Sequence, residues 1–177
     1  MTSSIFDDYL NHKNDTSLDY DDNLNLIINT WVKKITGLPE NLIRPLWQQD
    51  PPVIPKNGIN WCAFGVDTFT SYNPVFEQLT EYTDIRQNEE LTVLMRFYGQ
   101  QSQKIANQFR ISVLHPQNNY QLNKLGFTIG KVSQLVAFPE LINDKWHSRH
   151  DLSVFIRRRT NRVYDVKSLL QSDIKFI

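Results

Sequence analysis

The segment Glu89–Tyr98 alternates between polar and apolar residues, and this pattern constrains the fold more than any other feature of the sequence. Its apolar positions lie two apart, at Leu91, Val93, Met95 and Phe97. Because successive side chains of a strand point to opposite faces, this period predicts a half-buried antiparallel strand. A second run, Phe76–Ile85, precedes it. We therefore predict a β-hairpin whose polar turn lies at Arg86–Asn88.

A further strand is predicted just before this hairpin, over Trp61–Ser71, because the segment is rich in aromatic and β-branched residues. The alternation divides its side chains between two faces. One face carries Trp61, Ala63, Gly65, Asp67 and Phe69, and the other carries Cys62, Phe64, Val66 and Thr68.

Residues 22–36 have the pattern of an amphipathic helix. A single apolar stripe follows the helical period, at Leu24, Ile27, Ile28, Trp31, Val32 and Ile35. An aspartate at its start, Asp21 or Asp22, is a suitable N-cap. Two lysines near its end complement the helix dipole. Gly37 and Pro39 then end the helix.

Five prolines lie between Leu38 and Asn60, and they exclude a helix or a central strand from this segment. We expect an extended segment that crosses the surface. Its anchors in the core are predicted to be Leu42, Ile43, Leu46 and Trp47.

The second half of the chain again mixes helical and strand patterns. In chain order, the predicted elements are a helix over Gln101–Leu114, a short helical piece over Gln117–Leu125, a strand over Phe127–Phe138, a loop over Pro139–Asp144, a strand over Trp146–Arg159, a turn at Asn161 and a short return strand over Val163–Val166. Successive strands are joined by short links, which favours antiparallel pairing.

The order of elements predicts an α+β fold, with a mixed, mainly antiparallel sheet and two main helices packed on it. The 177 residues, of which 40% are hydrophobic and 21% charged, are typical of one globular domain. We expect residues 1–20 to form a flexible acidic N-terminal arm and residues 21–177 to form a single α+β domain.

No catalytic or metal-binding pattern is found in the sequence. Cys62 lies in an apolar strand, where a buried hydrophobic role is favoured over a nucleophilic one. His147 and His150 have an odd separation within a predicted strand, so they should point to opposite faces as exposed or interfacial residues. Glu89 and Glu90 are expected to be solvated. Nucleotide-binding loops and the G-x-S-x-G motif are missing from the sequence, so we expect no enzymatic activity, no cofactor and no metal.

The sequence also bears on the compartment. A single cysteine permits no internal disulfide, which fits a reducing environment. The acidic start of the chain does not resemble a signal peptide, and no apolar run is long enough for a transmembrane helix. The protein is therefore expected to be made and kept in a cytoplasm, without a membrane partner.

The most unusual feature is a basic cluster formed by Arg157, Arg158 and Arg159, with Arg149 and Arg162 nearby. Strand alternation would place the first and third of the consecutive arginines on one face and the second on the other. Three interpretations stay open: solvated charges at a strand end, salt bridges between subunits, or a surface that faces DNA.

Charge is balanced overall, with 19 basic and 19 acidic residues, but it is unevenly distributed. Residues 1–22 carry six aspartates against Lys13, whereas residues 145–167 carry seven lysines and arginines against two aspartates. Opposite charge at the two ends suits contacts between copies of the chain. Trp47, Trp61 and Trp146 flank loops, and any of them left exposed would be an interface anchor.

Several segments together resemble a known family. In chain order they read LIRPLWQQDPP, NWCAFGV, EELTVLMRFYG, LVAFPELINDKW and DLSVFIRRR. As a set, covering roughly residues 31–170, they resemble the neck or tail terminator proteins of contractile-tailed bacteriophages and prophages.

This resemblance implies a tail-terminator-like α+β fold and a structural role in the virion. Such proteins form a ring, expected here to be a homohexamer, that caps the tail tube and sheath. The ring joins the tail to head-completion or connector proteins and leaves a lumen for DNA. On this view Arg149, Arg157, Arg158, Arg159 and Arg162 are candidate ring-interface or lumen residues. The protein would be found in the tail or neck of the virion, and in the host cytoplasm during assembly.

Two other classes of function compete with this one. A DNA-binding module would use the same five arginines as a basic patch, and its binding would weaken steeply with salt. A hydrolase would use Cys62 or a pair of carboxylates. The structural role is the interpretation that we favour.

Overall fold

The computed structural model describes residues 12–14, 21–50, 52–56, 58–79 and 82–165. The chain divides into two compact units. Unit 1 comprises residues 1–18, 72–88 and 159–177, and unit 2 comprises residues 19–71 and 89–158. Strands β5 (Tyr82–Tyr98) and β10 (Arg149–Asp165) contribute residues to both units. Most of the predicted arm, residues 1–20, lies outside the described residues.

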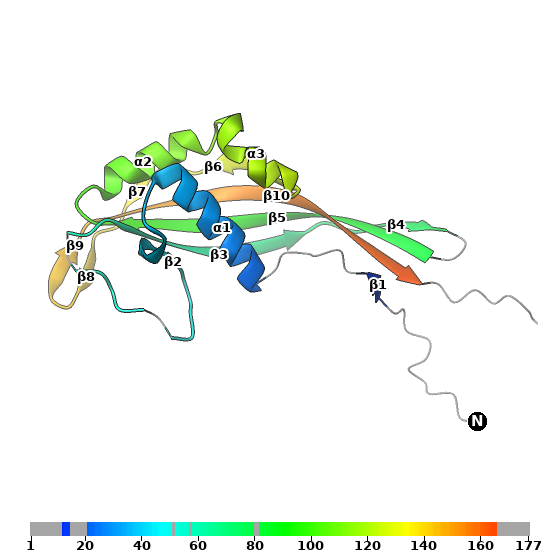
Figure 1. Ribbon diagram of the computed structural model, residues 1–177, viewed down its shortest axis with the longest axis horizontal. Helices are drawn as coiled ribbons and strands as arrows, with labels where there is room; N and C mark the ends of the chain where they lie inside the picture. Colours follow the sequence, from blue (N-terminus) through cyan, green and yellow to red (C-terminus); the bar gives the residue numbers. More distant parts are fainter. Residues whose placement is uncertain (1–11, 15–20, 51, 57, 80–81, 166–177) are drawn as a thin grey trace, which may run out of the picture. The chain divides into compact units, whose positions relative to one another are not determined.

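Unit 2 has the predicted α+β fold, with helices packed against a mixed, mainly antiparallel sheet (Figure 1). Its described helices are α1 (Asp21–Thr36), the 3-10 turn η1 (Glu40–Leu42), α2 (Ser102–Ser112) and α3 (Pro116–Lys124). Besides its parts of β5 and β10, its described strands are β2 (Ile43–Pro45), β3 (Trp61–Ser71), β6 (Phe127–Val132), β7 (Val136–Ala137), β8 (Glu140–Ile142) and β9 (Lys145–His147). The hydrogen-bonded order is β10-β5-β3-β2, with β6 and β7 on β10 and a separate β8–β9 pair.

The main core lies between the helices and one face of this sheet (Figure 1). The four alternating residues of β5, Leu91, Val93, Met95 and Phe97, are at most 1% exposed, which confirms the predicted half-buried strand. From the helices, Trp31 meets Phe109 edge-on, with ring centroids 5.4 Å apart. Burial of this apolar surface is the main source of stability for unit 2.

Helix α1 and strand β3 form where the sequence predicts them. The predicted stripe of α1 faces the core, and the helix ends at Gly37, which has a φ of 69° and donates its N–H to the carbonyl of Lys33 at 2.9 Å. In β3, Cys62 and Phe64 are fully buried in the main core. Trp61 belongs to a second cluster, as the predicted division of faces requires.

The proline-rich segment is only partly as predicted. It contains the single turn η1 and the short strand β2, which lies at the edge of the sheet and runs parallel to β3. Ile43 is buried, and Leu42 and Leu46 are half-buried against the second cluster. The prediction that Trp47 is a core anchor is wrong, because its side chain is 65% exposed.

The C-terminal strands differ from their predicted bounds. The predicted loop Pro139–Asp144 contains β8, which turns into β9 through Asn143 and Asp144. The predicted strand Phe127–Phe138 is interrupted between β6 and β7, where the side-chain hydroxyl of Ser133 accepts the backbone N–H of Ser153 on β10. The predicted turn at Asn161 and the return strand are wrong, because β10 continues without interruption to Asp165.

Unit 1 is a small sheet formed by β1 (His12–Asn14), β4 (Val75–Gln78) and its parts of β5 and β10. The predicted turn at Arg86–Asn88 is wrong, since these residues lie within β5 and the chain reverses between Gln78 and Tyr82. Their polarity reflects exposed strand positions, where Arg86 forms ion pairs with Glu77 and Asp84. Among the described residues, no helix is long and apolar enough to cross a membrane.

Candidate interaction surfaces

An aromatic and cationic cluster lies on the sheet face of unit 2 that is opposite the main core. Trp61 and Tyr98 stack with ring centroids 4.0 Å apart and an interplanar angle of 5°. The guanidinium of Arg44 lies 5.7 Å from the centre of the Trp61 ring, and that of Arg149 lies 5.8 Å from the centre of the Tyr98 ring. Trp61 and Tyr98 are cross-strand partners in β3 and β5, and cation–π attraction to the two arginines adds to their packing.

Arg149 is held in this cluster by two carboxylates. Its guanidinium donates to both oxygens of Asp151, at 2.8 and 2.5 Å, and to Glu140 at 2.9 Å. The hydrogen bond with Asp151 raises the pKa of Arg149 above its ordinary value. The hydroxyl of Tyr98 also donates to Glu140, at 3.0 Å, and burial raises the pKa of this phenol to about 12. Arg149 therefore stabilises unit 2 itself.

The consecutive arginines point alternately to opposite faces of β10, as predicted. In unit 2, Arg158 is 4% exposed in its side chain and donates to the buried carboxylate of Glu89 at 2.7 Å. Arg157, by contrast, is 67% exposed and donates to Glu90 at 2.9 Å. Glu89 is 2% exposed, so the prediction that it is solvated is wrong. Its ion pair with Arg158 explains how this carboxylate is accommodated in the interior.

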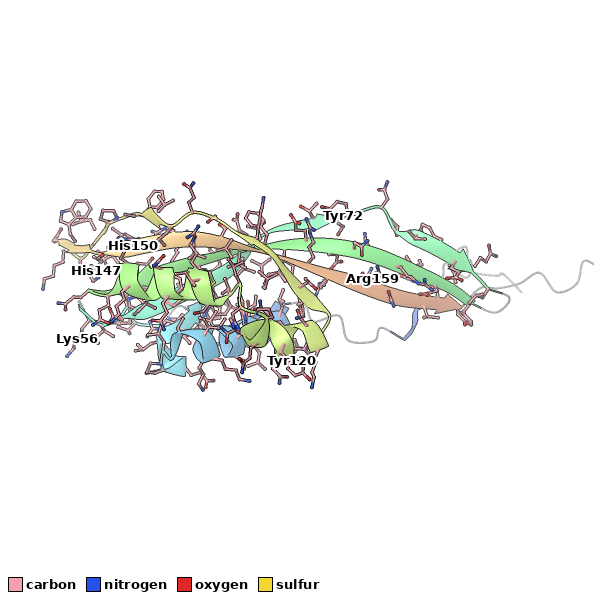
Figure 2. All side chains as sticks on the ribbon, turned by 90° about the horizontal axis from the view of Figure 1, so that it is seen from above. Lys56, Tyr72, Tyr120, His147, His150 and Arg159 are labelled. Atoms are coloured by element: carbon pink, nitrogen blue, oxygen red, sulfur yellow. The ribbon has the colours of Figure 1, made fainter. Side chains whose placement is uncertain are left out.

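The remaining two arginines of the cluster are described in unit 1. Arg159 is exposed on β10 (Figure 2) and donates to the side-chain oxygen of Asn88 at 3.4 Å. Arg162 is half-buried on the same strand. The five candidate residues thus differ in environment, from the buried Arg158 to the exposed Arg157 and Arg159.

The β8–β9 hairpin of unit 2 presents an exposed apolar pair. Leu141 and Trp146 are cross-strand partners and are 55% and 68% exposed, respectively. On the other side of the hairpin, Ile142 packs against the second cluster and anchors the hairpin to the sheet. Asn143 and Asp144 form the tight reversal with φ values of 48° and 59°. Large apolar side chains held rigidly at a surface are typical anchors of protein interfaces.

The sequence contained a signal for this hairpin that the prediction missed. Asn and Asp tolerate the left-handed backbone conformation better than other non-glycine residues. Adjacent Asn143 and Asp144 between two short runs that each contain an apolar residue are therefore a hairpin signal. Pro139 and the polar residues around them favoured a loop instead.

The other two tryptophans that flank loops have different environments. Trp61 is 8% exposed and belongs to the second cluster. Trp47 is mostly exposed, yet its ring lies so close to β3 that a Cβ atom added at Gly65 would be 2.6 Å from its Cζ3 atom. Glycine at position 65 therefore makes room for this ring. Trp47 and Trp146 are the two exposed tryptophans among the described residues.

The residues considered for catalysis are not arranged for it. Cys62 is fully buried, and burial raises the pKa of its thiol, so it is no nucleophile. The Nδ1 atom of His150 lies 3.0 Å from the hydroxyl of Ser102, but Ser102 is 1% exposed and inaccessible to a substrate. His147 lies on β9 at the same end of unit 2 (Figure 2), and its 8% exposure contradicts the prediction of an exposed or interfacial residue.

A search of the described residues finds no group of histidine, cysteine and carboxylate side chains arranged to hold a metal ion. An apolar groove of about 450 Å³ does lie between α1 and α3 of unit 2. Leu26 and Leu125, which are 63% and 53% exposed, and Trp31 and Ile35 are among the residues that line it. Lys34 is the charged residue among those that line it. The groove is thus suited to an apolar protein segment.

A family model described as "Phage neck terminator protein" matches residues 22–177. A search of curated proteins finds no match to this chain.

Proposed function

The chain belongs to the phage neck terminator protein family, and from this premise we propose that it forms a homohexameric ring that ends the phage tail. Membership confirms the resemblance noted from the sequence. The family is structural and non-enzymatic, and it implies contacts with tail components and a place in the virion tail or neck. In the proposed assembly the ring caps the tail tube and sheath, binds head-completion or connector proteins, and leaves a lumen for DNA. Assembly takes place in the host cytoplasm.

The exposed Leu141–Trp146 pair is the observation in the structure that best supports binding to neighbouring neck proteins. The pair lies on a hairpin that Ile142 anchors to the sheet, so little conformational entropy is lost when a partner covers it. A partner that buried the Trp146 ring would gain about 1–3 kcal/mol from the hydrophobic effect. We propose that this hairpin contacts the adjoining tail or head-completion protein.

All five arginines remain candidates for the ring interface or the lumen, but they differ in how exposed they are. The Arg157 side chain is 67% exposed even though it donates to Glu90, and Arg159 is exposed too, which suits contact with a neighbouring subunit or with DNA in transit. Arg149 and Arg158 are held by carboxylates of the same chain. This internal pairing argues against the alternative in which all five form a DNA-binding patch, because paired guanidiniums contribute less net charge to phosphate binding.

The first experiment measures the mass in solution by light scattering after size exclusion, across a concentration series, with and without purified tail tubes. We expect a discrete species at six times the 20.8 kDa mass of the chain, or the same ring bound to one end of the tubes in electron micrographs. A chain that stays monomeric under all conditions and does not bind tubes would contradict the proposal. Binding of duplex DNA by that monomer, weakening steeply with salt, would favour the DNA-binding alternative instead.

The second experiment tests the hairpin. Trp146→Ala is expected to weaken binding to tail tubes or head-completion proteins by about tenfold or more while the melting temperature stays close to that of the wild type. Tyr120→Ala serves as the control, because Tyr120 is a 55% exposed aromatic residue on α3. Equal effects of the two substitutions on tail binding would show that the hairpin has no special role.

A further inference from the structure

Trp47 of unit 2 has an unusual backbone conformation for a bulky residue. Its φ is 57°, in the left-handed region that side chains of this size rarely adopt. The residue before it is fixed to β3, because the N–H of Leu46 donates to the carbonyl of Phe64 at 2.6 Å. Residues held in such strained conformations are concentrated at functional sites. Since Trp47 is also 65% exposed, packing in the core does not explain its conformation.

Strand β3 is adapted to hold the ring of Trp47. A Cβ atom at Gly65 would lie 2.6 Å from the Cζ3 atom of this ring and 3.0 Å from its Cε3 atom, so the ring occupies the space that a side chain at position 65 would need. One part of the ring is thus fixed against the sheet, while most of the residue stays accessible. Because the ring is already ordered, a partner that covers it loses little conformational entropy.

Trp47 lines a cleft of about 550 Å³, which we call the Trp47 cleft and which is formed by α1, η1 and residues 45–49. The charged residues that line it are both acidic, Asp22 and Glu40. Glu40 is in an ion pair with Lys33 at 2.7 Å, whereas Asp22 forms no ion pair among the described residues. An indole ring and an unpaired carboxylate in one cleft favour a cation. Arginine fits best, because its planar guanidinium both stacks on indole and pairs with carboxylate.

The chain itself carries an arginine that suits this cleft. All its arginines are among the described residues, and three of them are exposed: Arg86, Arg157 and Arg159. Arg86 and Arg157 are each held by carboxylates of their own chain. Arg159 (Figure 2) instead donates to the neutral side-chain oxygen of Asn88, over a long distance of 3.4 Å. Among the described residues, Arg159 is therefore the exposed arginine that no carboxylate holds.

We propose that Arg159 of one copy binds in the Trp47 cleft of the adjacent copy, where its guanidinium lies on the Trp47 ring and pairs with Asp22. The proposal rests on the ring-forming function and identifies a contact across the seam of that ring. Arg159 belongs to unit 1 and the cleft to unit 2, so the two copies contribute different surfaces. Such a heterologous contact is the type that closes into rings, since each copy both gives an arginine and receives one.

The substitution Trp47→Gly separates a binding role of Trp47 from a structural one. Glycine adopts a positive φ without strain, so this change relieves the backbone while it removes the ring. We expect the melting temperature to stay close to that of the wild type. The protein concentration needed for ring formation, measured in the same light-scattering series, should rise by about tenfold or more. A lower melting temperature with unchanged assembly would overturn the proposal, because Trp47 would then be a structural residue.

A matched pair of substitutions tests the arginine. Arg159→Gln is expected to raise the concentration needed for ring formation by about tenfold or more. Arg86→Gln is the control, since Arg86 is an exposed arginine of the same unit that is held by carboxylates of its own chain. It should assemble like the wild type. Equal assembly of the two variants would contradict the role of Arg159.

Charge reversal tests the pairing of Arg159 with Asp22. Asp22→Arg chains alone would bring two cations together at each seam, and Arg159→Asp chains alone would bring two carboxylates together, so each should assemble poorly. An equimolar mixture can alternate the two chains around a ring with an even number of copies, and every seam then joins opposite charges. We expect the mixture to assemble at a concentration about tenfold lower than either variant alone. No gain on mixing would show that the two residues do not meet.

A crosslinking experiment keeps the proposal testable even if a charge-reversed variant misfolds. Gln49→Cys, in the lining of the cleft, and Arg159→Cys are prepared as separate chains, and the native Cys62 does not interfere because it is fully buried. A short bismaleimide is expected to link the two chains into a dimer. Ile111→Cys serves as the control partner for Arg159→Cys, since Ile111 is 62% exposed on α2 and does not line the cleft. Equal yields from the two mixtures would contradict the proposed contact.

The outcomes separate this proposal from the ring-forming function. If the wild type forms a ring but Trp47→Gly and Arg159→Gln assemble equally well and no specific crosslink forms, the proposed contact is wrong and the ring-forming function stands. If the wild type forms no ring with or without tail tubes, both proposals fail.

Discussion

The two adjacent arginines Arg157 and Arg158 provide a direct test of how burial decides the contribution of an ion pair. Both lie on β10 and both donate to a glutamate on β5, at 2.9 and 2.7 Å, respectively. They differ in exposure, since the Arg157 side chain is 67% exposed and the Arg158 side chain is 4% exposed. The perturbation we propose is the replacement of each by Met, which preserves the length of the side chain but removes the charge.

Removing the guanidinium of Arg158 would leave the carboxylate of Glu89, 2% exposed, buried without its ion-pair partner. Breaking a buried ion pair by removing one of its partners costs about 3–5 kcal/mol, so Arg158→Met should lower the free energy of unfolding by that amount. An exposed pair contributes about 1 kcal/mol or less, so Arg157→Met should have a small effect. Adding Glu89→Leu to Arg158→Met removes the buried charge and should recover most of the loss.

The assay is urea denaturation followed by tryptophan fluorescence, at a protein concentration where the chain is monomeric, so that assembly does not add to the measured stability. A difference of less than about 1 kcal/mol between Arg157→Met and Arg158→Met would refute the reasoning, because burial would then not decide the outcome. A loss of ring formation in Arg158→Met without a loss of stability would also refute it, since Arg158 would then act at an interface.

Three further predictions follow from the burial of single groups. Trp31→Ala should lower the free energy of unfolding by about 3–5 kcal/mol in the same urea assay, because Trp31 is 5% exposed and packs edge-on against Phe109. A loss below about 1 kcal/mol would show that Trp31 is not a core residue. Cys62 should not react with a thiol reagent in the folded protein and should react in urea, since burial raises the pKa of its thiol; rapid labelling of the native chain would contradict this. The pKa of Tyr98 is raised to about 12 from an ordinary value of 10.0, so the neutral phenol stabilises the folded state below pH 10.0 and this contribution is lost as the pH rises towards 12. The wild type should therefore lose more stability over that pH interval than the Tyr98→Phe variant. Parallel curves of unfolding free energy against pH for the two proteins would exclude the effect.

Most of the secondary structure of unit 2 could be predicted because it depends on short-range periodicity. The helical stripe of α1 extends over residues 24–35 and the alternation in β5 over residues 91–97, and local stereochemistry translates such repeats into helix or strand. The prediction failed where polar residues were taken as turns. Residues 86–88 and Asn161 are polar because their strands are exposed, and a strand with two accessible faces has no apolar alternation to identify it.

The candidate surfaces could be predicted only in part. The sequence identified Trp146 as a possible interface anchor, but the β8–β9 pairing brings Leu141 beside it. The consecutive arginines were also evident, together with their alternation between faces. Which of them is buried depends on Glu89, whose carboxylate reaches Arg158 from another strand.

The sequence by itself determined the elements of the core, the absence of a recognisable catalytic motif and the resemblance to phage terminators, because these depend on residue types and their spacing along the chain. The tertiary structure alone decided which charged and aromatic side chains are accessible. Trp47 and Trp61 are both flanked by loops, yet one is 65% exposed and the other 8%. Exposure depends on the elements that pack above a residue, which come from distant parts of the chain.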